Sequence, residues 1–273
     1  MPKIKINNVD HYYEQIGEGL ALVFIHGAFA DARIWEPQWK HFSSDYQLLR
    51  YDLRGHGRTG ASDLDRYSMA TFANDLASLL DELEIQSPII CGLSWGGSIA
   101  QAFAVQNPGR TRGLVLVGSA VAIDLTLTDK ILCKVLFPWW AMRLTINTMS
   151  VENFTRFSFW LASLTLGKQW LSRDKGASEY LKQCMHKMDG SEYLKIWEAI
   201  YGFSVLPLER IACPTMVLNG EHESKNTFRH TEEILRCVPQ AEAKVIPAAR
   251  HGMNLEEPEV FNEFVADFLH RSI

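Results

Sequence analysis

The stretch that decides the fold is PIICGLSWGGSIAQAFAVQ, residues 88–106. It begins with a short apolar run typical of a buried strand, passes through a glycine-rich segment, and continues at helical spacing, with Ile99 and Phe103 four residues apart. A strand that leads through a tight turn into a helix is the repeating step of sheets covered by helices. The stretch therefore predicts one strand–turn–helix step of a larger α/β fold.

Short β-rich runs alternate with helical patterns along most of the chain. This order predicts a mostly parallel central sheet with helices on both faces. The first two runs predict an opening hairpin, and the last helix closes the chain with an amphipathic pattern. The predicted strands are 3–8, 11–17, 20–27, 46–52, 88–93, 113–118, 214–220 and 243–247, and the predicted helices are 71–85, 98–106 and 260–273.

Residues 121–206 interrupt this alternation, because they contain no convincing strand pattern. We interpret them as a helical cap, or lid, inserted into a core domain made of residues 1–120 and 207–273. The segment is rich in tryptophan, which suits the lining of an apolar pocket, although the same side chains could simply attach the cap to the core. Its five tryptophans are Trp139, Trp140, Trp160, Trp170 and Trp197.

Composition excludes several classes of protein. With 273 residues and 47% hydrophobic content the chain can bury a large core, and a net charge of −5 without a basic run argues against nucleic acid as a partner. We find neither the apolar stretch of a signal peptide nor that of a membrane span, so we expect a soluble, cytoplasmic protein without stable membrane insertion. Five scattered cysteines suggest neither disulfides nor a metal site.

Residues Gly92 to Gly96 match the pattern G-x-S-x-G and place Ser94 between a predicted strand and a predicted helix. A nucleophilic serine is presented on such a turn, where its backbone is strained and the flanking glycines allow close packing. A bare match to so short a pattern is weak, and the strand-to-helix context supplies its specificity. We therefore expect Ser94 to be a nucleophile.

A serine hydroxyl needs a neighbouring base, normally a histidine that a carboxylate orients. His251 is the best-placed histidine, because it lies between the last predicted strand and the last predicted helix. The carboxylate is less well determined by the sequence. We favour Glu223, which follows the strand at 214–220, over Glu221 beside it and Asp124 after the strand at 113–118.

With these motifs in their order along nearly the whole chain, the sequence resembles the α/β-hydrolase superfamily. The resemblance implies an α/β-hydrolase fold, a serine–acid–histidine triad, and an oxyanion hole formed by the N–H of Ala28 or Phe29 and the N–H of Trp95. Glutamate replaces the family's usual aspartate at the third triad position. The DLRGHG segment is largely structural in the family. The matching segments are HGAF at 26–29, DLRGHG at 52–57, GLSWGG at 92–97, GEHE at 220–223 and RHG at 250–252.

A serine rather than an aspartate at the turn argues, by this resemblance, against epoxide hydrolases and haloalkane dehalogenases. We expect an esterase or lactonase that needs neither cofactor nor metal and acts on a small, apolar or aromatic ester or lactone. The motifs leave open a carbon–carbon bond hydrolase, a cofactor-free perhydrolase or haloperoxidase, and a ligand receptor on the same scaffold. They also leave the oligomeric state undetermined.

Overall fold

The computed structural model describes residues 2–165, 167 and 169–273. Within these residues, eight strands form one sheet in the order β1-β2-β4-β3-β5-β6-β7-β8. The first two strands form an antiparallel hairpin, β2 pairs antiparallel with β4, and all remaining pairs are parallel, which confirms the predicted sheet. The strands are β1 (Lys3–Ile6), β2 (Val9–Ile16), β3 (Ala21–Ile25), β4 (Gln47–Tyr51), β5 (Ile89–Leu93), β6 (Gly113–Val117), β7 (Thr215–Gly220) and β8 (Ala241–Ile246).

The central strands are apolar on both faces, because each face is covered by helices. In β3, Val23 and Ile25 belong to one hydrophobic cluster, whereas Leu22 and Phe24 belong to a second cluster on the opposite face. This alternation follows from the two-residue period of a strand. The core therefore consists of two apolar layers, one on each side of the sheet.

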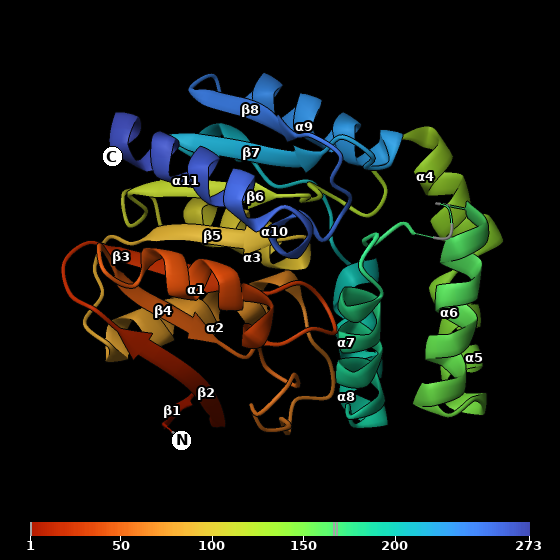
Figure 1. The fold of residues 1–273 in the computed structure, drawn as a ribbon. Helices are drawn as coiled ribbons and strands as arrows, with labels where there is room; N and C mark the ends of the chain where they lie inside the picture. The colour runs from red at the N-terminus through yellow and green to blue at the C-terminus, as the bar shows by residue number, and fades with distance from the viewer. Residues whose placement is uncertain (1, 166, 168) are drawn as a thin grey trace.

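Helices cover both faces of this sheet (Figure 1). α2, α3 and α9 contribute to the cluster that contains Val23, and α1, α10 and α11 contribute to the cluster that contains Phe24. α2 begins after Ser68, whose side chain accepts a hydrogen bond from the N–H of Thr71 and so caps the helix. These elements are η1 (Ala32–Trp35), α1 (Glu36–Phe42), α2 (Met69–Glu82), α3 (Trp95–Gln106), η3 (Leu208–Arg210), α9 (Lys225–Cys237), α10 (Met253–Glu256) and α11 (Pro258–Ser272).

The described residues of the segment 121–206 contain helices and no strand. Figure 1 shows these helices on one side of the sheet, beyond the carboxyl ends of its parallel strands. The division of the chain into a core and a cap stays a prediction. The helical elements of this segment are α4 (Leu127–Ile131), the π-helical turn η2 (Leu132–Leu136), α5 (Trp139–Thr148), α6 (Val151–Thr165), α7 (Lys175–His186) and α8 (Gly190–Tyr201).

Candidate active site

Ser94 lies on the turn between β5 and α3, in a conformation that is rare for a residue with a side chain. Its φ is 53° and its ψ is −116°. The N–H of Ser94 donates a hydrogen bond to the carbonyl of Val117 at 2.7 Å, so the neighbouring strand β6 holds the turn in place. Strained backbone of this kind persists only where the surrounding structure imposes it, and it occurs most often at functional sites.

Glycines around Ser94 permit the tight contact between turn, strand and helix. A Cβ atom added to Gly92 would lie 2.4 Å from the carbonyl oxygen of Gly96, and one added to Gly96 would lie 2.3 Å from the carbonyl oxygen of Ile25. Neither position can accept a side chain unless the backbone moves. The glycines of the G-x-S-x-G pattern are therefore explained by close packing.

His251 and Glu223 form a pair in the loops that follow β8 and β7. Nδ1 of His251 donates a hydrogen bond to Oε1 of Glu223 at 2.8 Å, which leaves Nε2 free to accept a proton. The Glu223 side chain is 5% exposed, and its second oxygen accepts a hydrogen bond from the hydroxyl of Thr227 at 3.2 Å. The carboxylate is thus fixed on both sides.

The two alternative carboxylates have other partners. Glu221 accepts a hydrogen bond from the N–H of Ala248 at 2.7 Å. Asp124 lies 3.0 Å from the ammonium group of Lys134. Among the three candidates from the sequence, the structure brings Glu223 to His251.

The pKa of His251 reflects two opposing effects. Burial by itself would lower this pKa. The charge of Glu223 and its hydrogen bond to the imidazole together raise the pKa by more than burial lowers it, so the net shift is upward from the ordinary value. The pair therefore stabilises the imidazolium form of His251. This is the form that a general base adopts after it has taken a proton.

The loop after β3 passes directly beside Ser94. A Cβ atom added to Gly27 would lie 3.5 Å from the Cβ of Ser94, and Phe29 in the same loop has a φ of 64°. Trp95 is the first residue of α3, where backbone N–H groups have no partner within the helix. Ala28 lines the same cavity as Ser94, and Trp95 follows Ser94 directly in the chain. Phe29 is the next residue after Ala28 in this loop, and the oxyanion hole stays a prediction.

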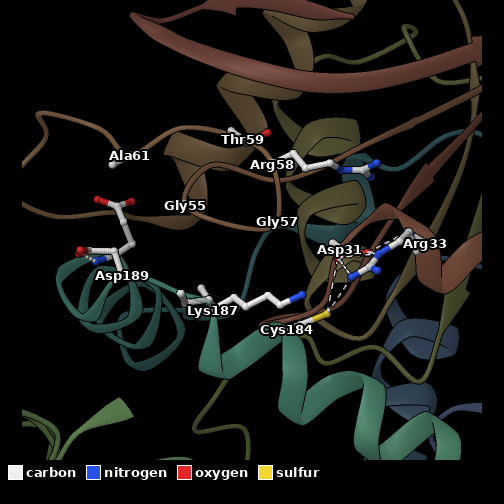
Figure 2. Close-up of a pocket in the computed structure, with 12 residues that line it drawn as sticks. Asp31, Arg33, Gly55, Gly57, Arg58, Thr59, Ala61, Cys184, Lys187 and Asp189 are labelled. Atoms are coloured by element: carbon white, nitrogen blue, oxygen red, sulfur yellow. Dashed lines mark hydrogen bonds and ion pairs between the residues drawn. The ribbon is translucent and has the colours of Figure 1, made fainter. Parts of the chain in front are cut away.

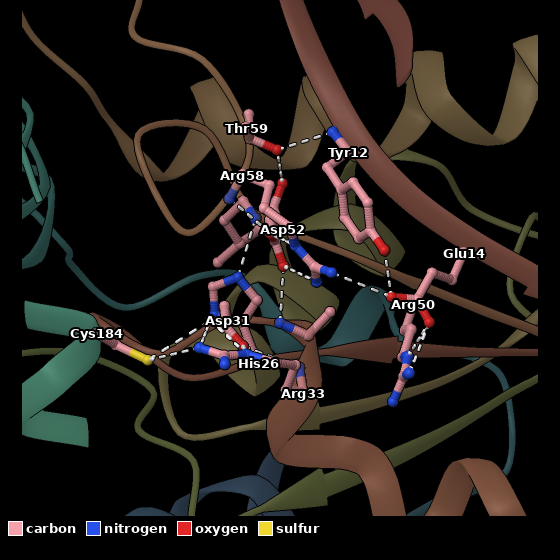
Figure 3. A network of polar contacts seen from close by, with 12 residues as sticks. Tyr12, Glu14, His26, Asp31, Arg33, Arg50, Asp52, Arg58, Thr59 and Cys184 are labelled. Atoms are coloured by element: carbon pink, nitrogen blue, oxygen red, sulfur yellow. Dashed lines mark hydrogen bonds and ion pairs between the residues drawn. The ribbon is translucent and has the colours of Figure 1, made fainter. Parts of the chain in front are cut away.

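A network of buried polar groups holds this loop (Figure 3). His26 accepts a hydrogen bond from the N–H of Leu53 at 2.9 Å, and Asp52 accepts hydrogen bonds from the N–H groups of Ala32 and Arg58. Nε2 of His26 must be unprotonated to accept the hydrogen bond from Leu53, and burial lowers the pKa of the ring, which favours the same neutral form. The network joins the loops after β3 and β4 and accounts structurally for HGAF and DLRGHG.

Ser94 and His251 line the same cavity, whose volume is about 250 Å³. Its apolar wall comes from Ile123, Ile200 and Phe203, and its polar wall comes from α9. The sequence analysis does not identify these α9 residues. A sequence signal for this helix is Ser224, which caps it: the Ser224 side chain accepts a hydrogen bond from the N–H of Thr227. The polar residues that α9 contributes are Asn226, Thr227 and His230.

A second cavity, of about 360 Å³, lies between the loop at 52–61 and helices α7 and α8 (Figure 2). Its lining is strongly charged, with the Asp31–Arg33 ion pair on one side and Lys187 reaching in from the other. It shares no lining residue with the cavity at Ser94. Within the described part of the chain, no three histidine, cysteine, aspartate or glutamate side chains are grouped to hold a metal ion.

Comparison with protein families matches residues 21–258 to the model of the alpha/beta hydrolase fold. The chain belongs to this family. It is 25% identical over 266 residues to (E)-2-((N-methylformamido)methylene)succinate hydrolase of Acinetobacter baylyi, covering 96% of this chain and 95% of the relative. It is 24% identical to 3-oxoadipate enol-lactonase 2 of the same organism over 257 residues, covering 92% of this chain and 89% of that relative.

Solved structures of this family have the same fold. The crystal structure of the enol-lactonase from Burkholderia xenovorans LB400 superimposes with a TM-score of 0.83 and 24% identity, covering 99% of this chain and 100% of that one. The α/β-hydrolase fold predicted from the sequence is therefore confirmed. In the described residues, no helix is sufficiently long and apolar to span a bilayer.

Proposed function

We propose that the protein is a serine hydrolase that cleaves a carboxylic ester or lactone through an acyl-enzyme. The observation that carries the proposal is that Ser94, on a strained turn, shares a cavity with His251, which is paired with Glu223 at 2.8 Å. This arrangement provides a nucleophile, a base and an orienting carboxylate.

In the acylation step, Oγ of Ser94 attacks the carbonyl carbon of the substrate while Nε2 of His251 takes the hydroxyl proton. Glu223 stabilises the imidazolium that results. When the C–O bond breaks, His251 returns the proton to the departing alkoxide. In a lactone the alcohol stays attached to the acyl group, so ring opening leaves a hydroxyacyl chain on Ser94.

In the deacylation step, water donates a proton to Nε2 of His251 and attacks the acyl carbon, which releases the acid and restores Ser94. Both tetrahedral intermediates carry a negative oxygen. The N–H of Trp95 and the N–H of Ala28 or Phe29 would stabilise that oxygen, assisted by the N-terminus of α3. The reaction needs neither a metal nor an organic cofactor.

The substrate class is supported by the cavity and by the relatives. A cavity of about 250 Å³ with Ile123, Ile200 and Phe203 in its wall suits a small, apolar or aromatic acyl group. One curated relative is named an enol-lactonase and another a hydrolase of a substituted succinate. Small esters and lactones are therefore the first substrates to test.

The test combines turnover with covalent labelling. We expect the purified protein to hydrolyse p-nitrophenyl acetate and butyrate, and to react with a fluorophosphonate that mass spectrometry locates on Ser94. Ser94→Ala serves as the control that should do neither. Parallel assays with longer acyl chains and with simple lactones would define the acyl group that the cavity accepts.

Three results would contradict the proposal. Absence of both turnover and labelling would exclude a serine esterase. Thermal stabilisation by a ligand together with negligible turnover would indicate a receptor, and peroxide-dependent oxidation of a halide in acetate buffer without ester hydrolysis would indicate a perhydrolase.

A further inference from the structure

The outer layer of the helical segment consists of α4, η2, α5 and α6, residues 127–165. α5 contacts α8 and α6 contacts α7, while α7 and α8 lie between these two helices and the sheet (Figure 1). The outer layer therefore has one side against α7 and α8 and another side that faces solvent.

Exposed apolar side chains are concentrated in the outer layer. Of the fifteen large apolar side chains exposed in the described part of the chain, ten belong to it. The most exposed are Leu127 at 75% and Trp140 at 70%, and Trp160 is 57% exposed. A concentration of this kind on the surface of a protein usually marks an interaction site.

The exposed residues recur at helical spacing, so each helix presents them as a stripe. Trp140 and Leu144 are four residues apart on α5, and Phe157, Trp160 and Leu164 follow at intervals of three and four on α6. A helix in a water-facing layer normally turns its apolar stripe toward the core. These helices carry apolar stripes that the fold leaves uncovered.

The residue types and charges indicate what covers the stripes. Tryptophan, phenylalanine and leucine on one face, with lysine and arginine nearby, are typical of helices that lie in the plane of a membrane interface. Residues 127–165 contain four basic and two acidic residues, a net charge of +2, in a chain whose total is −5. Lys134 and Arg156 are paired with Asp124 and Glu152, and the other basic residues are Lys130 and Arg143.

We propose that the outer layer docks on the surface of an anionic phospholipid bilayer, with its helices lying in the interface. The apolar side chains enter the boundary between headgroups and acyl chains, and the positive charge is attracted to anionic headgroups. A second copy of this chain fits less well, because two outer layers of net positive charge would repel each other. The surface does not involve Ser94, so it stands independently of the proposed chemistry.

The test is flotation of the purified chain with vesicles of phosphatidylcholine alone and of equimolar phosphatidylcholine and phosphatidylglycerol, at low and high salt. We expect binding to the anionic vesicles, weakened by salt. Trp140→Ser combined with Leu144→Ser should weaken binding by about tenfold or more, because two inserted apolar side chains are lost. The control, Leu64→Ser with Val245→Ser, removes two exposed apolar side chains that lie outside the outer layer and should bind as the wild type does.

Charge variants separate the electrostatic contribution. Lys130→Gln and Arg143→Gln should each weaken binding to anionic vesicles by about fivefold and leave binding to phosphatidylcholine unchanged. Circular dichroism and thermal unfolding show whether every variant is folded.

Absence of vesicle binding by the wild type would overturn the proposal, as would equal loss of binding in the control pair. A concentration-dependent dimer that forms without vesicles and is abolished by the Trp140 and Leu144 changes would overturn it as well. That result would assign the surface to a second copy of the chain.

Discussion

The backbone of Ser94 shows how one residue combines strain with function. A residue with a side chain at φ of 53° and ψ of −116° costs about 1–3 kcal/mol relative to a relaxed conformation, and glycine avoids most of that cost. The side chain that brings the nucleophile therefore destabilises the turn that presents it.

Ser94→Ala and Ser94→Gly separate these two effects. Both should lower kcat for ester hydrolysis by about 10⁶, because the hydroxyl acts as a unit with the base. The free energy of unfolding should be about 1 kcal/mol higher for the glycine variant than for the alanine variant, since only alanine keeps the Cβ that strains the turn. Urea unfolding measures the difference; equal stabilities would mean that the turn is not strained, and a loss of kcat below tenfold would mean that the nucleophile lies elsewhere.

Glu223→Gln tests the carboxylate. We expect kcat to fall by about 10⁴, because glutamine can hold neither the reactive tautomer nor the imidazolium of His251 in the same way. The pKa of His251 should also fall, since the effect that raises it is removed and burial remains. A base must be neutral to act, so the acidic limb of the kcat/KM profile should move to lower pH.

The control for this change is Glu221→Gln, two residues away. Its carboxylate accepts the N–H of Ala248, so we expect near-normal activity and an unshifted pH profile. Collapse of activity in Glu221→Gln with little loss in Glu223→Gln would reverse the assignment.

At the scale of elements, the sequence predicts the strands best. β3, β5 and β6 are short, continuous apolar runs between turn residues, and such runs have few alternative structures. α9 was not assigned, because its buried face includes His230 and Thr231 beside Ile234, and two polar residues weaken the apolar stripe. The predicted strand at 243–247 differs in its bounds from β8, which spans Ala241–Ile246, because exposed residues in β8 interrupt the alternation of apolar and polar positions.

The sequence predicts a residue of the candidate site only where that residue belongs to a recognisable local motif. The position of Ser94 follows from its local context, but three carboxylates remained possible partners of His251 because their distances depend on how distant loops pack. Gly118 illustrates the limit. A Cβ atom at this position would lie 2.8 Å from Oε1 of Glu223 and 3.1 Å from Nδ1 of His251, a contact that no local pattern reveals.

The turn between β5 and α3 gives a prediction at this scale. Gly92→Ala should lower the free energy of unfolding by about 3 kcal/mol, because the added Cβ collides with the backbone of Gly96 rather than with a mobile side chain. Gly190→Ala is the matched control. Its Cβ would meet Val151 at an ordinary 3.7 Å in the first turn of α8, so we expect a gain of about 0.5 kcal/mol in urea unfolding. Equal effects of the two changes would show that packing at Gly92 is loose.

At the scale of the whole molecule, the sheet assembles the site. Ser94 follows β5, Glu223 follows β7 and His251 follows β8, and these strands are parallel. The carboxyl ends of parallel strands lie at one edge, where open α/β sheets usually bind their ligands. Residues separated by more than 150 positions therefore meet because the topology directs three loops to the same place.

The same packing leaves several histidines buried, and this sets the pH dependence of stability. Burial lowers the pKa of His11, His26, His56 and His230, and that of His56 falls from 6.5 to about 3. Below about pH 6.5 the unfolded chain binds protons that the folded chain excludes, so stability falls as the pH is lowered. His251 acts in the opposite direction: its raised pKa adds stability below 6.5, which is lost as the pH rises through the folded pKa.

Stability should therefore be greatest near neutral pH and fall between about pH 6 and pH 5, where ordinary carboxyl groups are still ionised. Each buried histidine contributes up to about 1.4 kcal/mol per pH unit in that window. His56→Asn keeps a donor for the carbonyl of Arg54 but removes one titrating group, so the slope measured by urea unfolding should decrease by about that amount. A slope unaffected by the His56 change would mean that His56 takes up its proton in the folded protein.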